Sequence, residues 1–528
     1  MKILKTSLIF AGACFAHIAL YAQAPGTDWI NYQGNVEGFR FSPLTQVTKA
    51  NAGRLQPLWS YQIDHTDKFE ASPIVRGGIM YISEPPSDVT ALETRSGKVL
   101  WKYRRVYPDN IPTCCGRVNR GVAILGNRIY IGTLDAHLVA LDASSGNVVW
   151  DVEVADFRKG YTSTAAPMIV KDKVIIGSAG GEFGVRGYLA AYDAKTGKQA
   201  WRFWTVPNAG EPGSETWTGQ SLKTGSATTW VTGSYDPALN TLYWGTGNPG
   251  PDWKGTSRLG DNLYSDSLIA LDADTGKLKW HFQFTPHDVL DLDATQTPIL
   301  VDANWKGKPR KLLLFANRNC FYYVLDRTTG EYLLGKEYVR QTWAEPNLSD
   351  KGKATWRPNT QPTEQGTVVY PNSPGATNYQ APAYSPNTKL HYVMTRDEGG
   401  VFYSGDDTYK AGSWFLAGRF VSKPGEEATG GVKAMDPMTG TPKWTFETGP
   451  SWSGVLATGG GLVFTAMADG DMIALDDSTG KLLWRYPMGG KVNADPISYI
   501  GADGKQQIAI ASGHAIFAFG LRDTPPIN

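Results

Sequence analysis

The chain has 528 residues and a nearly balanced charge, with 51 lysine and arginine residues against 50 aspartate and glutamate residues and a net charge of +1. This balance, without a run of basic residues, argues against nucleic acid as a partner. The 59 glycines and 18 tryptophans are typical of a chain built from many short strands with tight turns, and no helical periodicity of useful length is present.

The first element along the chain is an export signal. Lys2 and Lys5 carry positive charge, and an apolar stretch runs from Leu8 to Leu20 before a few small residues. This order predicts a cleaved signal peptide over residues 1–24 and a periplasmic protein. The alternative, an uncleaved membrane anchor, is disfavoured because the apolar stretch is shorter than the roughly 20 residues that a span needs. No later segment is long and apolar enough to cross a bilayer.

The four cysteines fall into three groups. Cys14 leaves with the signal peptide, and Cys320 stands alone in a strand-like run, where it is expected to be a small buried apolar residue. Cys114 and Cys115 are adjacent. No C-x-x-C-H motif occurs, so the sequence predicts that no c-type haem is attached to this chain.

A repeat then organises the rest of the chain. It reads A-L-[DE]-x-x-[ST]-G-[KN]-x-x-W, in which an apolar strand leads into an Asp-x-x-Thr-Gly turn and a second strand carries the tryptophan. A degenerate copy has leucine in the tryptophan position, and Trp59 ends a weaker copy near the start. The clear copies and the degenerate one are Ala91–Trp101, Ala140–Trp150, Ala191–Trp201, Ala270–Trp280, Val324–Leu334, Ala434–Trp444 and Ala474–Trp484.

The spacing of these copies predicts the fold. Where no insertion intervenes, they lie about 40–50 residues apart, the period of a four-stranded propeller blade. Eight copies predict an all-β, eight-bladed β-propeller in a single domain over residues 25–528, with the repeat tryptophan packed between neighbouring blades. A linear solenoid or two separate sheets is the alternative, but a closed ring removes exposed sheet edges. Longer gaps before Trp280 and Trp444 predict inserted loops.

The inserted segments resemble those of one enzyme family. The repeat alone would also fit a non-enzymatic scaffold, such as the propeller lipoproteins of outer-membrane assembly. The segments TCCGRVNRGVAI, YWGTGNPGPDW, TPHDVLDLDATQTPILVD and ANRNCFYYVLDRTTG, however, are similar to those of PQQ-dependent (quinoprotein) alcohol dehydrogenases, and in particular to methanol and ethanol dehydrogenase large subunits, including the lanthanide-dependent type. The resemblance spans the mature chain in order. Adjacent cysteines followed by V-N-R-G are its most specific marker.

The resemblance implies a PQQ pocket. In the family, a disulfide between the adjacent cysteines lies against one face of the quinone and a tryptophan, here Trp230, against the other. Two free thiols, or a Trp230 that packs between blades, are the alternatives. Ala179 stands where the family often has serine, so one carboxylate contact is expected to be lost or to move to Ser178. The implied cofactor-binding residues are Glu70, Cys114, Cys115, Arg120, Thr164, Ala179, Gly180, Gly181, Trp230, Arg318, Asn378 and Trp452.

The resemblance also implies a metal ion and a catalytic base. Glu182, Asn248 and Asp291 match the family's oxygen ligands, which suit a hard cation. Asp291 would take the alcohol proton as general base, and Arg318 would hydrogen-bond the quinone oxygens. Asp293 is a fourth implied ligand, typical of lanthanide-dependent relatives, because a trivalent ion balances one more carboxylate than Ca²⁺ does. The expected metal is therefore a lanthanide (La or Ce) or Ca²⁺.

Substrate and partners follow only in outline. The expected reaction is oxidation of a small primary alcohol, with electrons passed to a separate periplasmic cytochrome c. Methanol dehydrogenases have a pocket-narrowing tryptophan soon after G-N-P, where this chain has Asp252 beside Trp253, so a substrate larger than methanol is favoured. The alternatives are a quinoprotein that acts on sugars or polymers, and a propeller scaffold without catalysis.

Overall fold

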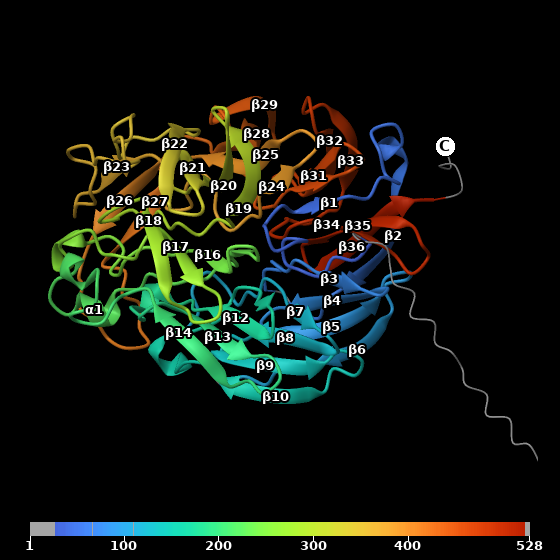
Figure 1. The fold of residues 1–528 in the computed structure, drawn as a ribbon, viewed down its shortest axis with the longest axis horizontal. Coiled ribbons are helices and arrows are strands. Elements are labelled where there is room, and N and C mark those ends of the chain that lie inside the picture. The colour runs from blue at the N-terminus through green and yellow to red at the C-terminus, as the bar shows by residue number, and fades with distance from the viewer. Residues whose placement is uncertain (1–26, 66, 109, 523–528) are drawn as a thin grey trace, which may run out of the picture.

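A computed structural model describes residues 27–65, 67–108 and 110–522. The predicted signal peptide, residues 1–24, lies outside the described residues. The described chain consists almost entirely of short antiparallel strands, gathered in small sheets that follow one another around a common centre (Figure 1). The prediction of an all-β propeller is confirmed.

Most sheets are made of four antiparallel strands, and in all but the last of those that follow here each strand pairs with its neighbours in sequence. In chain order they contain β3 (Ile74–Arg76), β4 (Ile79–Glu84), β5 (Asp88–Glu93) and β6 (Val99–Tyr103); β7 (Ala123–Leu125), β8 (Arg128–Gly132), β9 (His137–Asp142) and β10 (Val148–Glu153); β11 (Met168–Val170), β12 (Lys173–Gly177), β13 (Tyr188–Asp193) and β14 (Gln199–Trp204); β15 (Ser234–Asp236), β16 (Thr241–Gly245), β17 (Ser267–Asp272) and β18 (Leu278–Gln283); β19 (Ile299–Trp305), β20 (Lys308–Ala316), β21 (Phe321–Asp326) and β22 (Glu331–Glu337); and β24 (Ala383–Ser385), β25 (Leu390–Asp397), β28 (Thr429–Asp436) and β29 (Thr441–Glu447).

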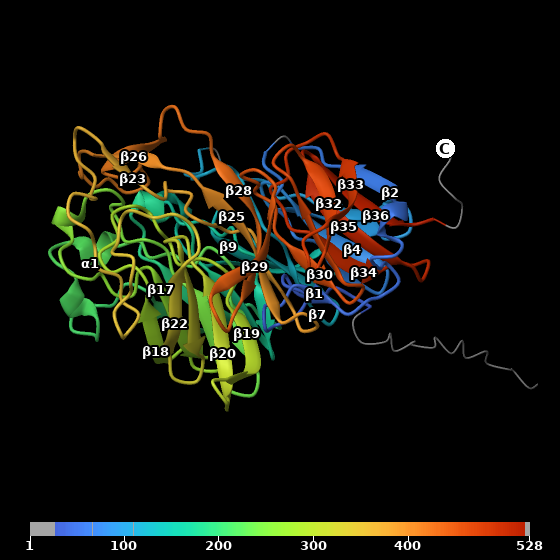
Figure 2. The ribbon, with the colours of Figure 1, turned by 90° about the horizontal axis from the view of Figure 1, so that it is seen from above.

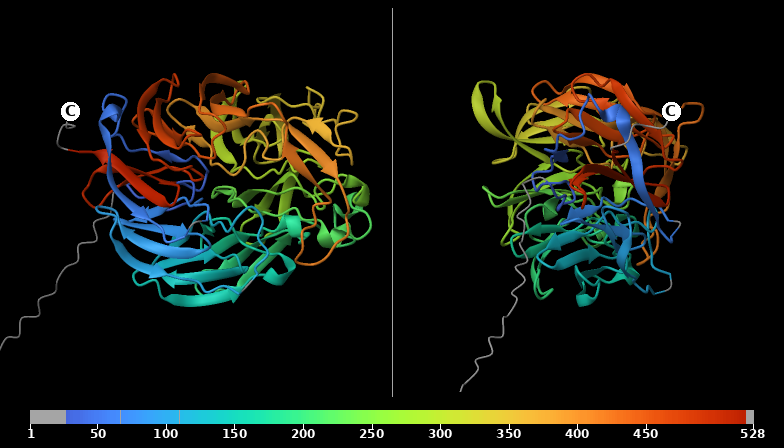
Figure 3. Two further views of the ribbon diagram at one scale, coloured as in Figure 1. Left: turned by 180° about the vertical axis from the view of Figure 1, so that it is seen from behind. Right: turned by 90° about the vertical axis from the view of Figure 1, so that its right-hand side faces the viewer.

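The two ends of the described chain meet in shared sheets. Strand β1 (Phe41–Ser42) runs parallel to β30, at the edge of the sheet of β30 (Leu456–Thr458), β31 (Leu462–Ala466), β32 (Asp471–Asp476) and β33 (Leu482–Pro487). Strand β2 (Leu55–Gln62) pairs with β36 (Ala515–Leu521), next to β35 (Gln506–Ser512) and β34 (Ile497–Ile500). Figure 3 shows the blue start of the chain beside its red end. Strands from the start and the end of the described chain therefore lie in the same sheets.

The repeat turns form as the sequence predicts. In the turn after β9, Asp142 Oδ1 accepts hydrogen bonds from the backbone N–H groups of Ser144 and Ser145, both at 3.0 Å. Gly146 closes the turn with φ of +74°, a left-handed conformation that glycine adopts without strain. The same aspartate-capped turn follows β13, β17, β21 and β32.

Each repeat tryptophan packs on the turn of the next sheet. Trp201, for example, donates from Nε1 to the carbonyl oxygen of Ala273 at 3.1 Å. A Cβ on Gly276 would lie 2.5 Å from the Trp201 ring, so the turn glycine is needed for close approach as well as for its φ. In the degenerate copy, Leu334 packs on Gly440 in the same way. The corresponding donors and acceptors are Trp59 to Thr94, Trp101 to Ala143, Trp150 to Ala194, Trp280 to Arg327, Trp444 to Asp477 and Trp484 to Leu55.

Insertions leave the sheets mainly at one side. A three-stranded sheet of β23 (Thr367–Val369), β26 (Gly400–Ser404) and β27 (Gly418–Ser422) interrupts the sheet that holds Trp444, and α1 (Ser221–Thr224) lies in another insertion. Figure 2 shows α1, β23 and β26 beyond the ends of the blade strands. The remaining short helices are η1 (Ala52–Arg54), η2 (Phe157–Lys159), η3 (Gly181–Phe183), η4 (Ser214–Thr216) and η5 (Gly255–Ser257).

Apolar residues of the strands fill the space between sheets, as in the cluster around Phe315, Tyr323 and Leu325. Cys320 is fully buried and unpaired, which confirms its prediction as a small apolar residue. Within the described residues, no helix has the length and apolar character that a membrane span requires.

Candidate active site

Loops from around the ring line one chamber of about 590 Å³, within the usual range for small-molecule sites. All the predicted site residues except Gly181 and Asn248 line it. They come from the connections between strands, one or a few from each: Glu70 follows β2, Thr164 follows β10, Arg318 lies between β20 and β21, and Trp452 between β29 and β30. The site is therefore assembled from residues far apart in sequence.

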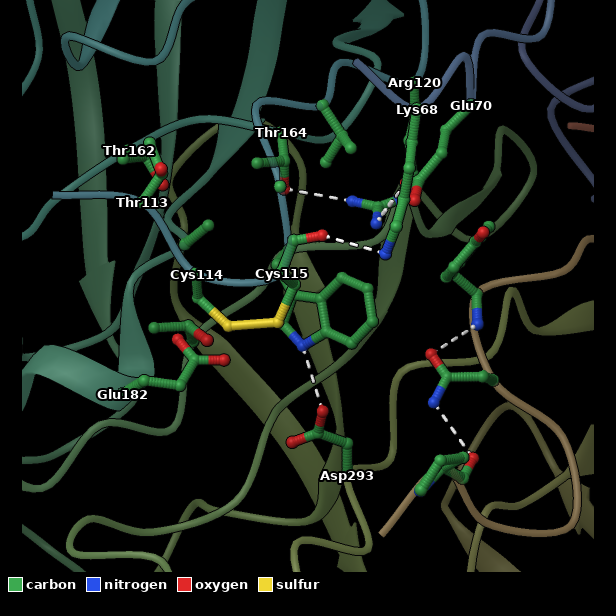
Figure 4. Close-up of a pocket in the computed structure, with 18 of the residues that line it drawn as sticks. Lys68, Glu70, Thr113, Cys114, Cys115, Arg120, Thr162, Thr164, Glu182 and Asp293 are labelled. Atoms are coloured by element: carbon green, nitrogen blue, oxygen red, sulfur yellow. Dashed lines mark hydrogen bonds and ion pairs between the residues drawn. A yellow bond between two sulfur atoms is a disulfide. The ribbon is translucent and has the colours of Figure 1, made fainter. Parts of the chain in front are cut away.

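The adjacent cysteines form a disulfide on the chamber wall. Cys114 and Cys115 are bonded, with their Cα atoms 3.8 Å apart. The alternative of two free thiols is therefore wrong for this structure. Both sulfur atoms lie within 4.8 Å of a carboxylate oxygen of Glu182. In Figure 4, Glu182 and Asp293 lie on one side of the disulfide, whereas Lys68, Glu70 and Arg120 lie on the other.

The side of the disulfide that holds Lys68, Glu70 and Arg120 is cationic. Arg120 pairs with Glu70 at 2.7 Å and donates to Thr164 Oγ1 at 3.1 Å. Its guanidinium group lies 4.9 Å from the centre of the Trp230 ring. Burial raises the pKa of Glu70, and the charge of Arg120 offsets part of this rise. Lys68 also faces the chamber and donates to the carbonyl oxygen of Cys115 at 3.1 Å. This end suits an anionic ligand.

The opposite end is acidic. Arg318 lies 3.2 Å from Asp291 and forms an ion pair with Asp293. Burial, together with the charge of Asp293, raises the pKa of Glu182 to about 7. Burial also raises the pKa of Asp291 well above its usual range, against the opposing effect of Arg318. Three carboxyl groups therefore lie at this end of the chamber with one cation, and an added cation would relieve their mutual repulsion.

The loop after β18 places two of these carboxyl groups by local hydrogen bonds. Asp288 accepts from the backbone N–H groups of Leu290 and Leu292 at 2.8 and 2.6 Å. Leu290 and Leu292 are fully buried, so the alternate residues Asp291 and Asp293 face the chamber. The Ser373 hydroxyl donates to Asp291 Oδ2 at 2.5 Å and fixes its orientation.

Asn248 and Gly181 lie behind the chamber lining. The backbone N–H of Asn248 donates to Asp293 Oδ1 at 2.5 Å, and its carbonyl accepts from Ala227 N at 2.9 Å. Gly181 begins η3, which carries Glu182, and its carbonyl accepts from Ser226 Oγ at 2.7 Å. Both residues support the acidic end without facing the cavity.

Ser178 does not replace the expected serine contact. It is fully buried, and its hydroxyl group exchanges hydrogen bonds with the backbone of Tyr188 at 2.9 and 3.2 Å. Ala179 lines the chamber with no hydroxyl group, so the contact that the family makes there is absent at both positions. Gly180, beside it, has φ of +102°, and a Cβ there would lie 1.9 Å from the carbonyl oxygen of Gly160.

Several residues that line the chamber were not predicted from the sequence. Tyr379 lies under Arg120, with its ring centre 4.5 Å from the guanidinium carbon, and stacks on Trp452 at 5.6 Å. Tyr379 directly follows the predicted Asn378, which is the only local signal for it. The others with polar side chains are Lys68, Thr113, Thr162, Thr228, Ser373, Lys491 and Asn493.

Family models match two parts of the chain. The model described as glucose/ethanol/alcohol dehydrogenase, β-propeller domain (PQQ), matches residues 29–340. The model described as outer membrane protein assembly factor BamB matches residues 428–518.

Curated relatives and solved structures match nearly the whole chain. The quinoprotein alcohol dehydrogenase PedH of Pseudomonas putida is 38% identical, over 97% of this chain and 91% of the relative. The lanthanide-dependent methanol dehydrogenase of Methylacidiphilum fumariolicum is 36% identical, over 93% and 85%. A europium-containing methanol dehydrogenase structure superimposes with a TM-score of 0.89 and 32% identity, over 94% and 98% of the two chains. The quinohemoprotein alcohol dehydrogenase of Comamonas testosteroni has a TM-score of 0.88 and 34% identity, over 96% and 82%.

Proposed function

The chain belongs to the PQQ family of glucose, ethanol and alcohol dehydrogenase β-propellers, and on this premise we propose that it is a periplasmic quinoprotein that oxidises a primary alcohol to an aldehyde. The observation that carries the proposal is the polarity of the chamber. One end offers cations, the other offers carboxyl groups, and a disulfide lies between them. A cofactor with its own carboxylates and a hard metal ion together satisfy both ends.

The residues of the cationic end fit PQQ. Arg120, Thr164 and Lys68 would hold its carboxylate groups, while Trp230 and the Cys114–Cys115 disulfide offer flat surfaces to its ring system. Asn378, Trp452 and the Ala179–Gly181 backbone complete the rim. When bound, PQQ supplies the carbonyl group that accepts hydride, and a metal ion beside it supplies Lewis-acid polarisation.

Asp291 is the residue that we assign as general base. It lies at the chamber surface, accepts a hydrogen bond from Ser373 at 2.5 Å and is 3.2 Å from Arg318. Burial raises the pKa of Asp291 well above its usual range, and the positive charge of Arg318 offsets part of this rise. Asp291 would take the hydroxyl proton of the alcohol, while Arg318 would donate hydrogen bonds to developing negative charge.

The metal site is assigned to Glu182, Asn248, Asp291 and Asp293, with oxygen atoms as ligands. We propose a lanthanide ion, La³⁺ or Ce³⁺, in preference to Ca²⁺. The relatives described as lanthanide-dependent and europium-containing support this assignment by similarity. The additional carboxylate of Asp293 supports it by charge, because its repulsion with Glu182 is best relieved by a trivalent ion.

Export, blade number and electron acceptor belong to the same proposal. The N-terminal sequence supports export, and the absence of a C-x-x-C-H motif supports transfer of electrons to a separate cytochrome c. Eight blades are supported by the docking contacts, which lead from Trp59 through every repeat and through Leu334 to Trp484, whose partner is Leu55 in the strand of Trp59.

Two other functions are weighed against this one. The match of residues 428–518 to an assembly-factor model is an observation in favour of a scaffold. That segment contains the repeats that end at Trp444 and Trp484 but, of the predicted site residues, only Trp452, so blade similarity accounts for it. A quinoprotein for sugars or polymers would use the same chamber, and kinetics across alcohols, aldoses and polyvinyl alcohol separates it from an alcohol dehydrogenase.

Reconstitution tests the proposal. Metal-free and cofactor-free protein is given PQQ, La³⁺ or Ca²⁺, alone and together, with an artificial dye as electron acceptor. We expect alcohol oxidation only when PQQ and a metal ion are both present, and the absorption spectrum should show bound quinone. Activity with NAD, or absence of quinone binding with any metal, would overturn the assignment.

A further inference from the structure

Asp252 is a buried carboxyl group that the proposed mechanism does not use. It lies in the long loop between β16 and β17, four residues after Asn248, and its side chain is 3% exposed. Among the described residues, its Oδ1 atom has no hydrogen-bond partner. A buried carboxylate oxygen without a partner is costly and indicates a missing ligand or ion.

The surroundings of Asp252 are those of the acidic end. Burial raises the pKa of Asp252 well above its usual range, the charges of Asp291 and Glu182 raise it further, and the Asn248 side chain lowers it. Backbone hydrogen bonds connect the loops of Asp252 and Glu182 through a third segment. Phe415 N donates to the carbonyl oxygen of Glu182 at 2.7 Å. Next to it, the carbonyl oxygen of Leu416 accepts from Trp253 N at 3.1 Å. Asp252 and Glu182 are therefore held by one connecting segment.

The nearby cation does not neutralise this carboxyl group. Arg258 is fully buried, and its guanidinium group donates to the backbone oxygens of Pro251, Asp252 and Asp288. Its remaining bond goes to Asn262 Oδ1 at 2.9 Å. Across the described part of the chain, no ion pair includes the Asp252 side chain. Arg258 thus shapes the loop backbone and leaves the Asp252 carboxyl group available.

A substrate contact explains Asp252 less well. The chamber lining includes Phe420 and Ser373 but neither Asp252 nor Asn248. Both residues lie behind the cavity surface, on the side of Glu182 and Asp291. An alcohol in the chamber would meet the lining residues first, whereas an ion held between Glu182, Asn248 and Asp291 would lie beside Asp252.

We propose that Asp252 supplies a further carboxylate oxygen to the metal ion. This inference rests on the proposed function. Its consequence is a change in charge: with Arg318 counted, Glu182, Asp291 and Asp293 leave two net negative charges. With Asp252 they leave three, which La³⁺ neutralises. Asp252 thus adds to Asp293 in favouring a trivalent over a divalent ion.

Metal binding by full-length, PQQ-loaded protein tests this role. Equilibrium dialysis against buffered free La³⁺ or Ca²⁺, followed by elemental analysis, gives the two dissociation constants. We expect Asp252→Asn to weaken La³⁺ binding by at least about 10–100-fold, the loss that removal of an outer-shell partner of a metal ligand already causes. Ca²⁺ binding should change less, so the preference for La³⁺ narrows by at least about tenfold. The Eu³⁺ luminescence lifetime, compared in H₂O and D₂O, should report one additional bound water.

The matched control is Asp261→Asn, because Asp261 is exposed in the same loop and loses the same charge. It should leave both dissociation constants unchanged. Asp252→Ser is the second variant if the asparagine variant fails to fold, since Arg258 bonds to the backbone rather than to this side chain. Equal La³⁺ binding by wild type and either Asp252 variant would overturn the inference. Failure of the wild type to bind PQQ with either metal would overturn the proposed function instead.

Discussion

The blade turns and the chamber loops use their residues in opposite ways. Most turns repeat the same aspartate, glycine and docking tryptophan, and they make the same kind of contact with the next sheet. Each chamber loop contributes different residues, and no other loop duplicates Asp291 or Arg318. The repeated residues hold a ring together, whereas the non-repeated ones build a site. Substitutions in the blade turns should therefore lower the stability of the fold, whereas substitutions in the chamber loops should lower turnover or ligand binding.

The largest expected effect is that of Asp291→Asn on turnover. The variant keeps the shape of the side chain and can still contact Ser373, but it cannot take a proton. Turnover should fall by about 10²–10⁴-fold, the usual contribution of a positioned base, and the melting temperature should change little. Steady-state kinetics with PQQ and metal bound, next to a thermal scan, checks both expectations.

Bound cofactor and metal must be measured in the same sample, since Asp291 is also an assigned ligand. If turnover stays near that of the wild type at full occupancy of both, another residue is the base.

The second effect belongs to the blades. Trp201 is buried at the sheet interface, bonded to Ala273 and packed on Gly276. Trp201→Ala should destabilise the protein by about 3–5 kcal/mol, as expected for a large aromatic residue removed from a core. Turnover per folded, PQQ-loaded molecule should be unchanged. Denaturant unfolding and active-site titration measure the two quantities.

The chain offers its own control for this change. Leu334 fills the position of the tryptophan in one copy and packs on Gly440. Trp201→Leu should therefore cost less stability than Trp201→Ala. Equal losses in the two variants would mean that the indole hydrogen bond, rather than packing, dominates the contact.

The fold was predictable because the repeat carries it. Turn aspartates, glycines and tryptophans act within a few residues or on the next blade, so their spacing alone predicts hairpins and docking. The sequence did not predict that a separate three-stranded sheet, which includes β23 and β26, would form in the insertion before Trp444. That sheet pairs segments on either side of β25, and no repeat marks it.

Site residues were predictable only where they lie in a segment that resembles a motif of the family. Similarity led to Arg120, Trp230 and Asp291, all of which line the chamber. It could not show that the Ser178 hydroxyl group points toward the backbone of Tyr188. The direction of such a hydroxyl group depends on tertiary contacts that the local sequence does not contain. Likewise, Asp252 reads in the sequence as a pocket residue, yet it lies behind the lining because Arg258 folds its loop.

A third prediction concerns the metal ion. Asp293→Ala removes a carboxylate that pairs with Arg318 and accepts from Trp230 Nε1 at 3.1 Å. La³⁺ affinity should fall by at least about 10–100-fold, the loss that removal of an outer-shell partner already causes. The activation by lanthanides should disappear, and weak Ca²⁺-dependent activity should remain. A metal titration of metal-free protein with PQQ present measures this, with Asp261→Asn as the charge-matched control. Full activity of the wild type with Ca²⁺ alone, without further gain from lanthanides, would contradict the role of Asp293.

The smallest effect on stability is expected from removal of the Cys114–Cys115 disulfide, which lies in the chamber wall although disulfides usually stabilise a fold. A disulfide stabilises a protein mainly by closing a loop in the unfolded chain, and the Cys114–Cys115 bond joins adjacent residues and closes almost none. Changing both cysteines to alanine should therefore leave the melting temperature nearly unchanged. Turnover and PQQ affinity should fall several-fold, because the disulfide forms part of the chamber wall beside Glu182. A large drop in melting temperature with unchanged turnover would place this bond with the blade contacts, and the separation between the two regions would fail at this point.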